Sequence, residues 1–88
     1  MIITGTIRDD AGRPVVSARA FIIDAPGPFP DVAALTTDDG TFQLSVGIAG
    51  RYRPACHADG FVPAVVDVAV ENSAAPSAVD VTLLPRAG

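Results

Sequence analysis

Apolar and polar residues alternate along much of the chain, and this period of two predicts β-strands with one buried face. In the first such run Ile3, Gly5 and Ile7 alternate with threonine and arginine. A second strand is expected at 17–24, where both faces carry apolar side chains, so it should lie inside a sheet. No stretch has the 3.6-residue period of a helix.

The middle of the chain predicts a β-hairpin. A short strand at 32–37 leads into Asp38-Asp39-Gly40, and Phe42 and Leu44 then alternate with polar residues. An Asp-Gly pair between two such runs is a strong hairpin signal, because its residues tolerate the positive φ that tight turns require.

Three further strands are expected at 51–59, 62–70 and 79–83. Pro54 has no backbone N–H, so the fifth strand should lie at a sheet edge or carry a bulge there. Seven short strands ended by turn residues fit an all-β fold, an antiparallel sandwich of two sheets. We therefore expect a single domain over residues 1–88, with 85–88 as a frayed tail.

Composition and charge narrow the function. The chain has 88 residues, of which 49% are apolar, so one core of modest stability is expected. The net charge is −4 and every basic residue is an arginine, which leaves no cationic stripe for nucleic acid or anionic lipid. No apolar stretch reaches the ~18 residues that a spanning helix needs, so no membrane insertion is expected.

The start of the chain bears on localisation. Met1 leads straight into the first predicted strand, without the basic and apolar segments of a secretory signal. As given, the chain is therefore expected in the cytoplasm, unless a longer parent or a signal has been removed.

A proline-rich loop at 25–31 is the candidate docking site for a partner. Its residues are Pro26, Pro28, Phe29, Pro30 and Asp31. Prolines order a loop in advance and lower the entropy lost on binding, and an aromatic residue held among them can serve as an anchor. The alternative is that Phe29 folds back as a lid over the core.

The opposite end of the sandwich is expected to be acidic. If consecutive strands reverse, the turns at 9–10, 38–39 and 59–60 gather five aspartates at one end. Carboxylates supply the oxygen ligands that calcium prefers, which makes ion or small-molecule binding an alternative function. The structural explanation is that aspartate favours turns, and no DxDxDG-like spacing is present.

No catalytic, metal or cofactor site is expected. Cys56 and His57 are neighbours on one predicted strand, so their side chains point to opposite faces and cannot act as a nucleophile and its base. Cys56 should be a buried core residue, and His57 should lie on a solvated face or pair with Asp59. One histidine and one cysteine do not make a zinc centre.

The turn and core positions form a pattern over nearly the whole chain. It comprises Gly5-x-Ile7-x-Asp9-x-x-Gly12-x-Pro14-Val15-x-x-Ala18, Thr36-x-x-Asp39-Gly40-x-Phe42-x-Leu44, Gly50-x-Tyr52 and Gly60-Phe61. This pattern resembles the carboxypeptidase regulatory-like domain family. The resemblance implies a Greek-key sandwich of the transthyretin-like, immunoglobulin-like kind, and an accessory module that is often extracellular or periplasmic.

We therefore interpret the chain as a non-catalytic module that docks a protein partner or belongs to a larger assembly, with a homodimer through an edge strand as one form. A degenerate hydrolase is a further alternative. Hydrolases of the transthyretin type end in Tyr-Arg-Gly-Ser and use several histidines, whereas this chain ends in Pro-Arg-Ala-Gly and has one histidine.

Overall fold

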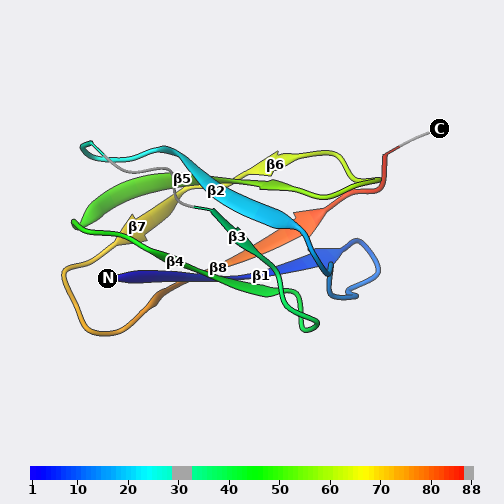
Figure 1. Ribbon diagram of the computed structural model, residues 1–88, viewed down its shortest axis with the longest axis horizontal. Helices are drawn as coiled ribbons and strands as arrows, with labels where there is room; N and C mark the ends of the chain where they lie inside the picture. Colours follow the sequence, from blue (N-terminus) through cyan, green and yellow to red (C-terminus); the bar gives the residue numbers. More distant parts are fainter. Residues whose placement is uncertain (29–32, 87–88) are drawn as a thin grey trace.

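Eight strands and no helix are assigned across residues 1–28 and 33–86, the part of the chain that this computed structural model describes (Figure 1). The strands are β1 (Ile2–Asp9), β2 (Arg19–Asp24), β3 (Ala33–Leu35), β4 (Thr41–Ser45), β5 (Gly50–His57), β6 (Ala64–Val65), β7 (Val68–Val70) and β8 (Ser77–Leu83). Within those residues no helix is long and apolar enough to span a bilayer.

The strands form two sheets. One has the order β4-β1-β8, and the other has the order β3-β2-β5-β6 with β7 also beside β5. The predicted all-β sandwich is confirmed. Its pairing is antiparallel except between β1 and β8, which run parallel from Ile3 opposite Ser77 to Asp9 opposite Leu83. The sequence did not reveal this pair because it joins the first and last strands, and loop lengths do not determine strand order.

The predicted alternation sets the core between the sheets. Ile3 and Ile7 of β1 are fully buried, as is Leu83 of β8. Phe42 of β4 lies directly opposite Gly5, and its ring occupies the space that a side chain on Gly5 would need. The missing Cβ therefore makes room for an aromatic ring in the core.

The predicted sixth strand is interrupted. β6 and β7 both pair with β5 in one continuous register, from Cys56 opposite Ala64 to Gly50 opposite Val70, but the ladder breaks at residues 66–67. The break lies beside Pro54, which has no N–H to donate; only its carbonyl is used, by the N–H of Val66 at 3.0 Å. Taken as one interrupted strand, β6 and β7 restore the predicted count of seven.

Pro54 also marks an irregularity on its other side. β5 is not an edge strand, since β2 lies on one side of it and β6 and β7 on the other. The register with β2 shifts between Ile22 and Asp24, opposite Pro54. Of the two sequence alternatives, edge or bulge, the bulge is the one observed, although it falls on the neighbouring strand.

Two segments differ from expectation in length. The third strand was expected at 32–37 but β3 covers three residues, and Val32 lies outside the described residues. Pro85 and Arg86, expected in a frayed tail, are paired: Pro85 bridges to Phe61, and the N–H of Arg86 donates to the Gly60 carbonyl at 2.8 Å. Residues 87–88 lie outside the described part of the chain.

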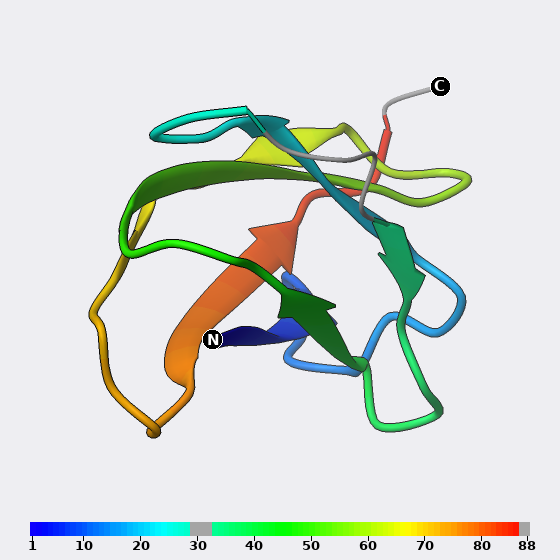
Figure 2. The same cartoon turned by 60° about the vertical axis from the view of Figure 1, so that its left-hand side comes forward.

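The turns gather at two ends, as strand reversal predicted. The turns that follow β1, β3 and β5 lie at the right in Figure 1, while the loops after β2, β4 and β7 lie at the left with the N-terminus. Figure 2 shows the two sheets as separate layers. The ends of the sandwich are therefore built by distinct sets of loops.

Candidate functional site

The described part of the proline-rich loop rests on the turn that follows β4. Pro26 and Pro28 are exposed. Pro26 packs so closely on Gly50 that a Cβ at Gly50 would lie 2.6 Å from Pro26 Cγ. Tyr52 stabilises this turn, because its hydroxyl donates a hydrogen bond to the Ile48 carbonyl at 2.6 Å. Phe29, Pro30 and Asp31, the rest of the predicted docking site, lie outside the described residues.

At the acidic end, Asp9 serves its own turn. Its Oδ1 accepts the N–H groups of Ala11 and Arg13, both at 2.9 Å, which is the local bonding that makes aspartate a turn residue. Among residues 1–28 and 33–86 no three histidine, cysteine, aspartate or glutamate side chains come together as a metal site would require. The turns share an end, but their carboxylates do not converge.

Cys56 and His57 lie on opposite faces of β5. Cys56 is fully buried, and this burial raises the pKa of its thiol to about 11, which keeps it in the unreactive neutral form. His57 is half-buried on the outer face, where its ring centroid lies 5.2 Å from that of Phe21. The expected pair with Asp59 is not among the salt bridges of the described residues. The arrangement offers no nucleophile and base.

An apolar surface covers part of the outer face of the five-stranded sheet. Leu35 lies beside Arg19 across β3 and β2, and His57 continues this row on β5. The next row contains Phe21 and ends at Val65 on β6. Leu35 is 62% exposed and Val65 is 53% exposed. We call these five residues the outer apolar face.

Sequence reasoning did not identify this face as a site. The 17–24 segment carries the signal, since both of its faces are partly apolar, but this pattern by itself predicts only a central strand position. Which neighbouring residues continue the surface depends on the register with β3 and β5, and single-strand periodicity does not contain that information.

A hollow of about 570 Å³ borders the outer apolar face at the end where β5 finishes. Five of its nine lining residues are apolar, and the polar ones are Ser17, Arg19, His57 and Asp59. The lining residues are Val15, Val16, Ser17, Arg19, Leu35, His57, Ala58, Asp59 and Phe61. Apolar walls with a few charged side chains suit the binding of a side chain from another molecule.

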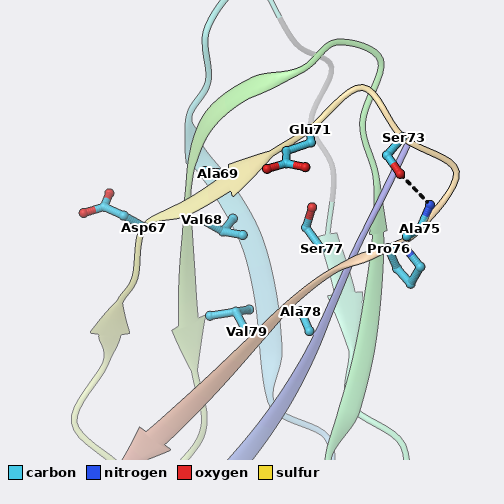
Figure 3. Close-up of a pocket in the computed structure, with 10 residues that line it drawn as sticks. All are labelled: Asp67, Val68, Ala69, Glu71, Ser73, Ala75, Pro76, Ser77, Ala78 and Val79. Carbon is cyan, nitrogen blue, oxygen red and sulfur yellow. Dashed lines mark hydrogen bonds between the residues drawn. The ribbon is translucent and has the colours of Figure 1, made fainter.

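A second hollow, of about 410 Å³, lies between β7 and β8 (Figure 3). Ser73 there accepts the N–H of Ala75 at 3.1 Å, a bond that shapes the loop. Asp67 points away from the hollow and pairs with Arg53 at 3.0 Å. Glu71 is the remaining carboxylate of the lining, and it has no histidine or cysteine beside it there. The hollow therefore has no set of groups for acid–base chemistry.

Comparison with solved structures finds chains of similar fold. Two similar solved chains come from type II cohesin–X-dockerin complexes of Acetivibrio cellulolyticus, one an N-terminal and the other a C-terminal interface mutant. The first has a TM-score of 0.68 and 14% identity, covering 97% of this chain and 58% of that one. The second has a TM-score of 0.61 and 17% identity, covering 94% and 56%.

This chain therefore spans little more than half of the length of those two chains, and the likeness is one of fold. No curated protein matches the sequence. The sequence model of the carboxypeptidase regulatory-like domain matches residues 2–84, which is nearly the whole chain. The resemblance first drawn from the turn and core motifs is thereby confirmed, and this chain belongs to the carboxypeptidase regulatory-like domain family.

Proposed function

We propose that this chain is a non-catalytic module that binds another protein through the outer apolar face. The observation that carries the proposal is the exposure of Leu35 and Val65 on one regular sheet surface, beside Arg19 and His57. Apolar side chains next to an arginine and an aromatic pair are the composition of protein interfaces. A flat sheet surface also holds these groups in fixed positions, so little entropy is lost on binding.

The comparisons support a protein partner. Both similar solved chains come from complexes of cohesin with X-dockerin, so the fold is used there in assemblies of proteins. The dispersed positions of Cys56 and His57 favour binding over catalysis.

Affinity capture followed by cross-linking tests the proposal. The intact chain is compared with Leu35→Glu, which places a charge at the most exposed apolar position of the outer apolar face. Ile2→Glu is the matched control, because Ile2 is an exposed apolar residue, 40% accessible, on the other sheet. We expect Leu35→Glu to lose the captured protein and Ile2→Glu to retain it. Equal retention by both variants would exclude this face as the binding surface.

The proline-rich loop is a second proposed docking surface. It is favoured by the exposed Pro26 and Pro28 and by the packing of Pro26 on Gly50. Phe29→Ala should then reduce capture while the melting temperature stays within a few degrees of the parent. A large fall in melting temperature would instead assign Phe29 to the core as a lid.

A further inference from the structure

The hollow beside the outer apolar face is built by three segments that meet at one end of the sandwich. The connection between β1 and β2 supplies residues 15–17, and the turn after β5 supplies residues 58, 59 and 61 (Figure 1). Between them lies the row of Leu35, Arg19 and His57, in which the register places neighbouring residues directly opposite one another. The volume of about 570 Å³ is within the range of binding sites in proteins.

Hydrogen bonds to the rest of the fold hold the walls of the hollow in place. The N–H of Val15 donates to the Ile7 carbonyl at 2.9 Å, and the N–H of Phe61 donates to the Ala58 carbonyl at 3.2 Å. The Phe61 carbonyl in turn accepts a hydrogen bond from Nη2 of Arg86 at 3.2 Å. Because these walls exist before a ligand arrives, binding in the hollow costs little conformational entropy.

Ser17 lines the hollow in a strained backbone conformation. Its φ is 59°, and it is the only non-glycine residue with a positive φ in the part of the chain that the structure describes. Side chains disfavour this region, and residues held there gather at binding sites. The conformation falls between Val16, which lines the hollow and is 49% exposed, and Ala18, which is fully buried. The strained residue therefore marks the point where the chain passes from the hollow into the core.

Two charged side chains line the hollow, and among the described residues neither Arg19 nor Asp59 takes part in an ion pair. Arg19 is exposed within the row, with an apolar residue opposite it on one side and His57 on the other. A guanidinium donates two parallel hydrogen bonds to a carboxylate, and apolar neighbours strengthen such a pair by lowering the local dielectric. The hollow thus offers a donor for an anionic group next to apolar walls.

The position of the two charges favours a carboxylate as the ligand. Arg19 lies inside the row on β2, and His57 beside it is a second donor, whereas Asp59 lies in the exposed turn after β5. The net charge of −4 acts weakly at this point, because charges more than about 8 Å away are screened at physiological salt. The charge next to the apolar walls is therefore that of Arg19.

We propose that the hollow binds a segment of the partner protein in which an aliphatic side chain lies beside a glutamate or aspartate. The aliphatic side chain packs on Val16, Leu35 and Phe61, and the carboxylate accepts hydrogen bonds from the guanidinium of Arg19. The inference rests on the proposed function, since it specifies the chemistry of the protein that docks on the outer apolar face.

Peptides of opposite charge test the proposal directly. One short capped peptide alternates leucine with glutamate, and its matched counterpart alternates leucine with lysine. Each is titrated into the isotope-labelled chain, and the amide chemical shifts are followed by NMR. The glutamate peptide should shift the amides of Ser17, Leu35 and Phe61 with a dissociation constant of about 1 mM or tighter, and the lysine peptide should leave them unchanged.

Variants of the two charged side chains should act in opposite directions. Arg19→Gln should raise the dissociation constant of the glutamate peptide about ten-fold, because the charged hydrogen bonds are lost. Asp59→Asn should lower it about two-fold, because a nearby like charge is removed. Arg51→Gln is the matched control, since it removes an exposed arginine at the far end of β5, outside the lining, and should change nothing.

Tighter binding of the lysine peptide, weakened by Asp59→Asn, would assign a cation to the hollow and overturn the proposal. So would the absence of any shift with the glutamate peptide at about 10 mM. In either case, loss of capture by Leu35→Glu would still support the proposed function. Equal capture by Leu35→Glu and Ile2→Glu would instead reject the proposed function itself.

Discussion

Gly5 and Phe42 show how one small residue determines the packing around it. Gly5 is buried in the middle of β1, and the Phe42 ring lies where its side chain would be. Glycine weakens a strand because it costs backbone entropy and fills no space, but here the aromatic ring supplies the missing contact. The sequence places both residues on the inward row, whereas the close contact follows from the β1–β4 register.

Gly5→Ala should destabilise the fold by about 1–3 kcal/mol, because the methyl group overlaps the Phe42 ring and the core has no room for it. Urea unfolding measures the change. Gly47→Ala, at an exposed turn with nothing within 4 Å, is the control and should alter stability by less than about 0.5 kcal/mol. Combining Gly5→Ala with Phe42→Leu should recover part of the lost stability, because the smaller side chain leaves room for the methyl group. If the stability losses of the two single variants simply added in the double variant, residues 5 and 42 would not be in contact.

The buried thiol of Cys56 gives the stability a pH dependence in the alkaline range. Burial raises its pKa from 9.0 to about 11 in the folded chain, so the neutral form is favoured by folding. The contribution of the neutral thiol to the free energy of unfolding is complete below pH 9 and is lost as the pH rises towards 11. The loss should reach about 2–3 kcal/mol relative to Cys56→Ala in denaturant titrations over this range. Parallel curves for the two proteins would contradict it.

At the scale of elements, a buried threonine joins two connections that are distant in sequence. Thr36 follows β3 and is 5% exposed. Its Oγ1 donates to the Val15 carbonyl at 2.6 Å and accepts the N–H of Ala18 at 2.9 Å. The segment between β1 and β2 is thereby fastened to the segment between β3 and β4. Periodicity does not reveal this role: Thr36 falls in the strand expected at 32–37, but its partners at Val15 and Ala18 are distant in sequence.

Thr36→Val keeps the shape of the side chain but removes its hydroxyl. The Val15 carbonyl and the Ala18 N–H then lose a buried hydrogen-bond partner, which should lower the free energy of unfolding by about 2–4 kcal/mol. The adjacent Thr37 is exposed and bonds Thr41 through its hydroxyl at 2.9 Å, so Thr37→Val should cost under about 1 kcal/mol. Chemical denaturation of both variants provides the comparison. Similar losses at the two positions would show that the buried bonds are not responsible.

At the scale of the whole molecule, the acidic turns come together at one end of the sandwich without forming an ion site among the described residues. The acidic turns share one end, yet Asp9 bonds its own turn and no described group of three ligands forms there. Clustering several turns at one end is thus a consequence of strand reversal and does not by itself create an ion site.

Calcium should therefore leave the fold unaffected. A ligand that binds only the folded state raises the melting temperature, and one without a site does not. With about 1 mM calcium we expect the melting temperature to change by less than about 1 °C, with magnesium as the matched control. A shift produced by calcium and not by magnesium would contradict this expectation and restore the ion-binding alternative.

The sequence by itself determined where most strands lie, the inward and outward rows, the family and the separation of Cys56 from His57. These follow from alternation and turn chemistry, which act between residues close in the chain. Only the tertiary structure decided the parallel pairing of β1 with β8, the break beside Pro54 and the continuity of the outer apolar face. Each of these depends on which strands become neighbours and in what register, and that choice is made by the packing of the whole core.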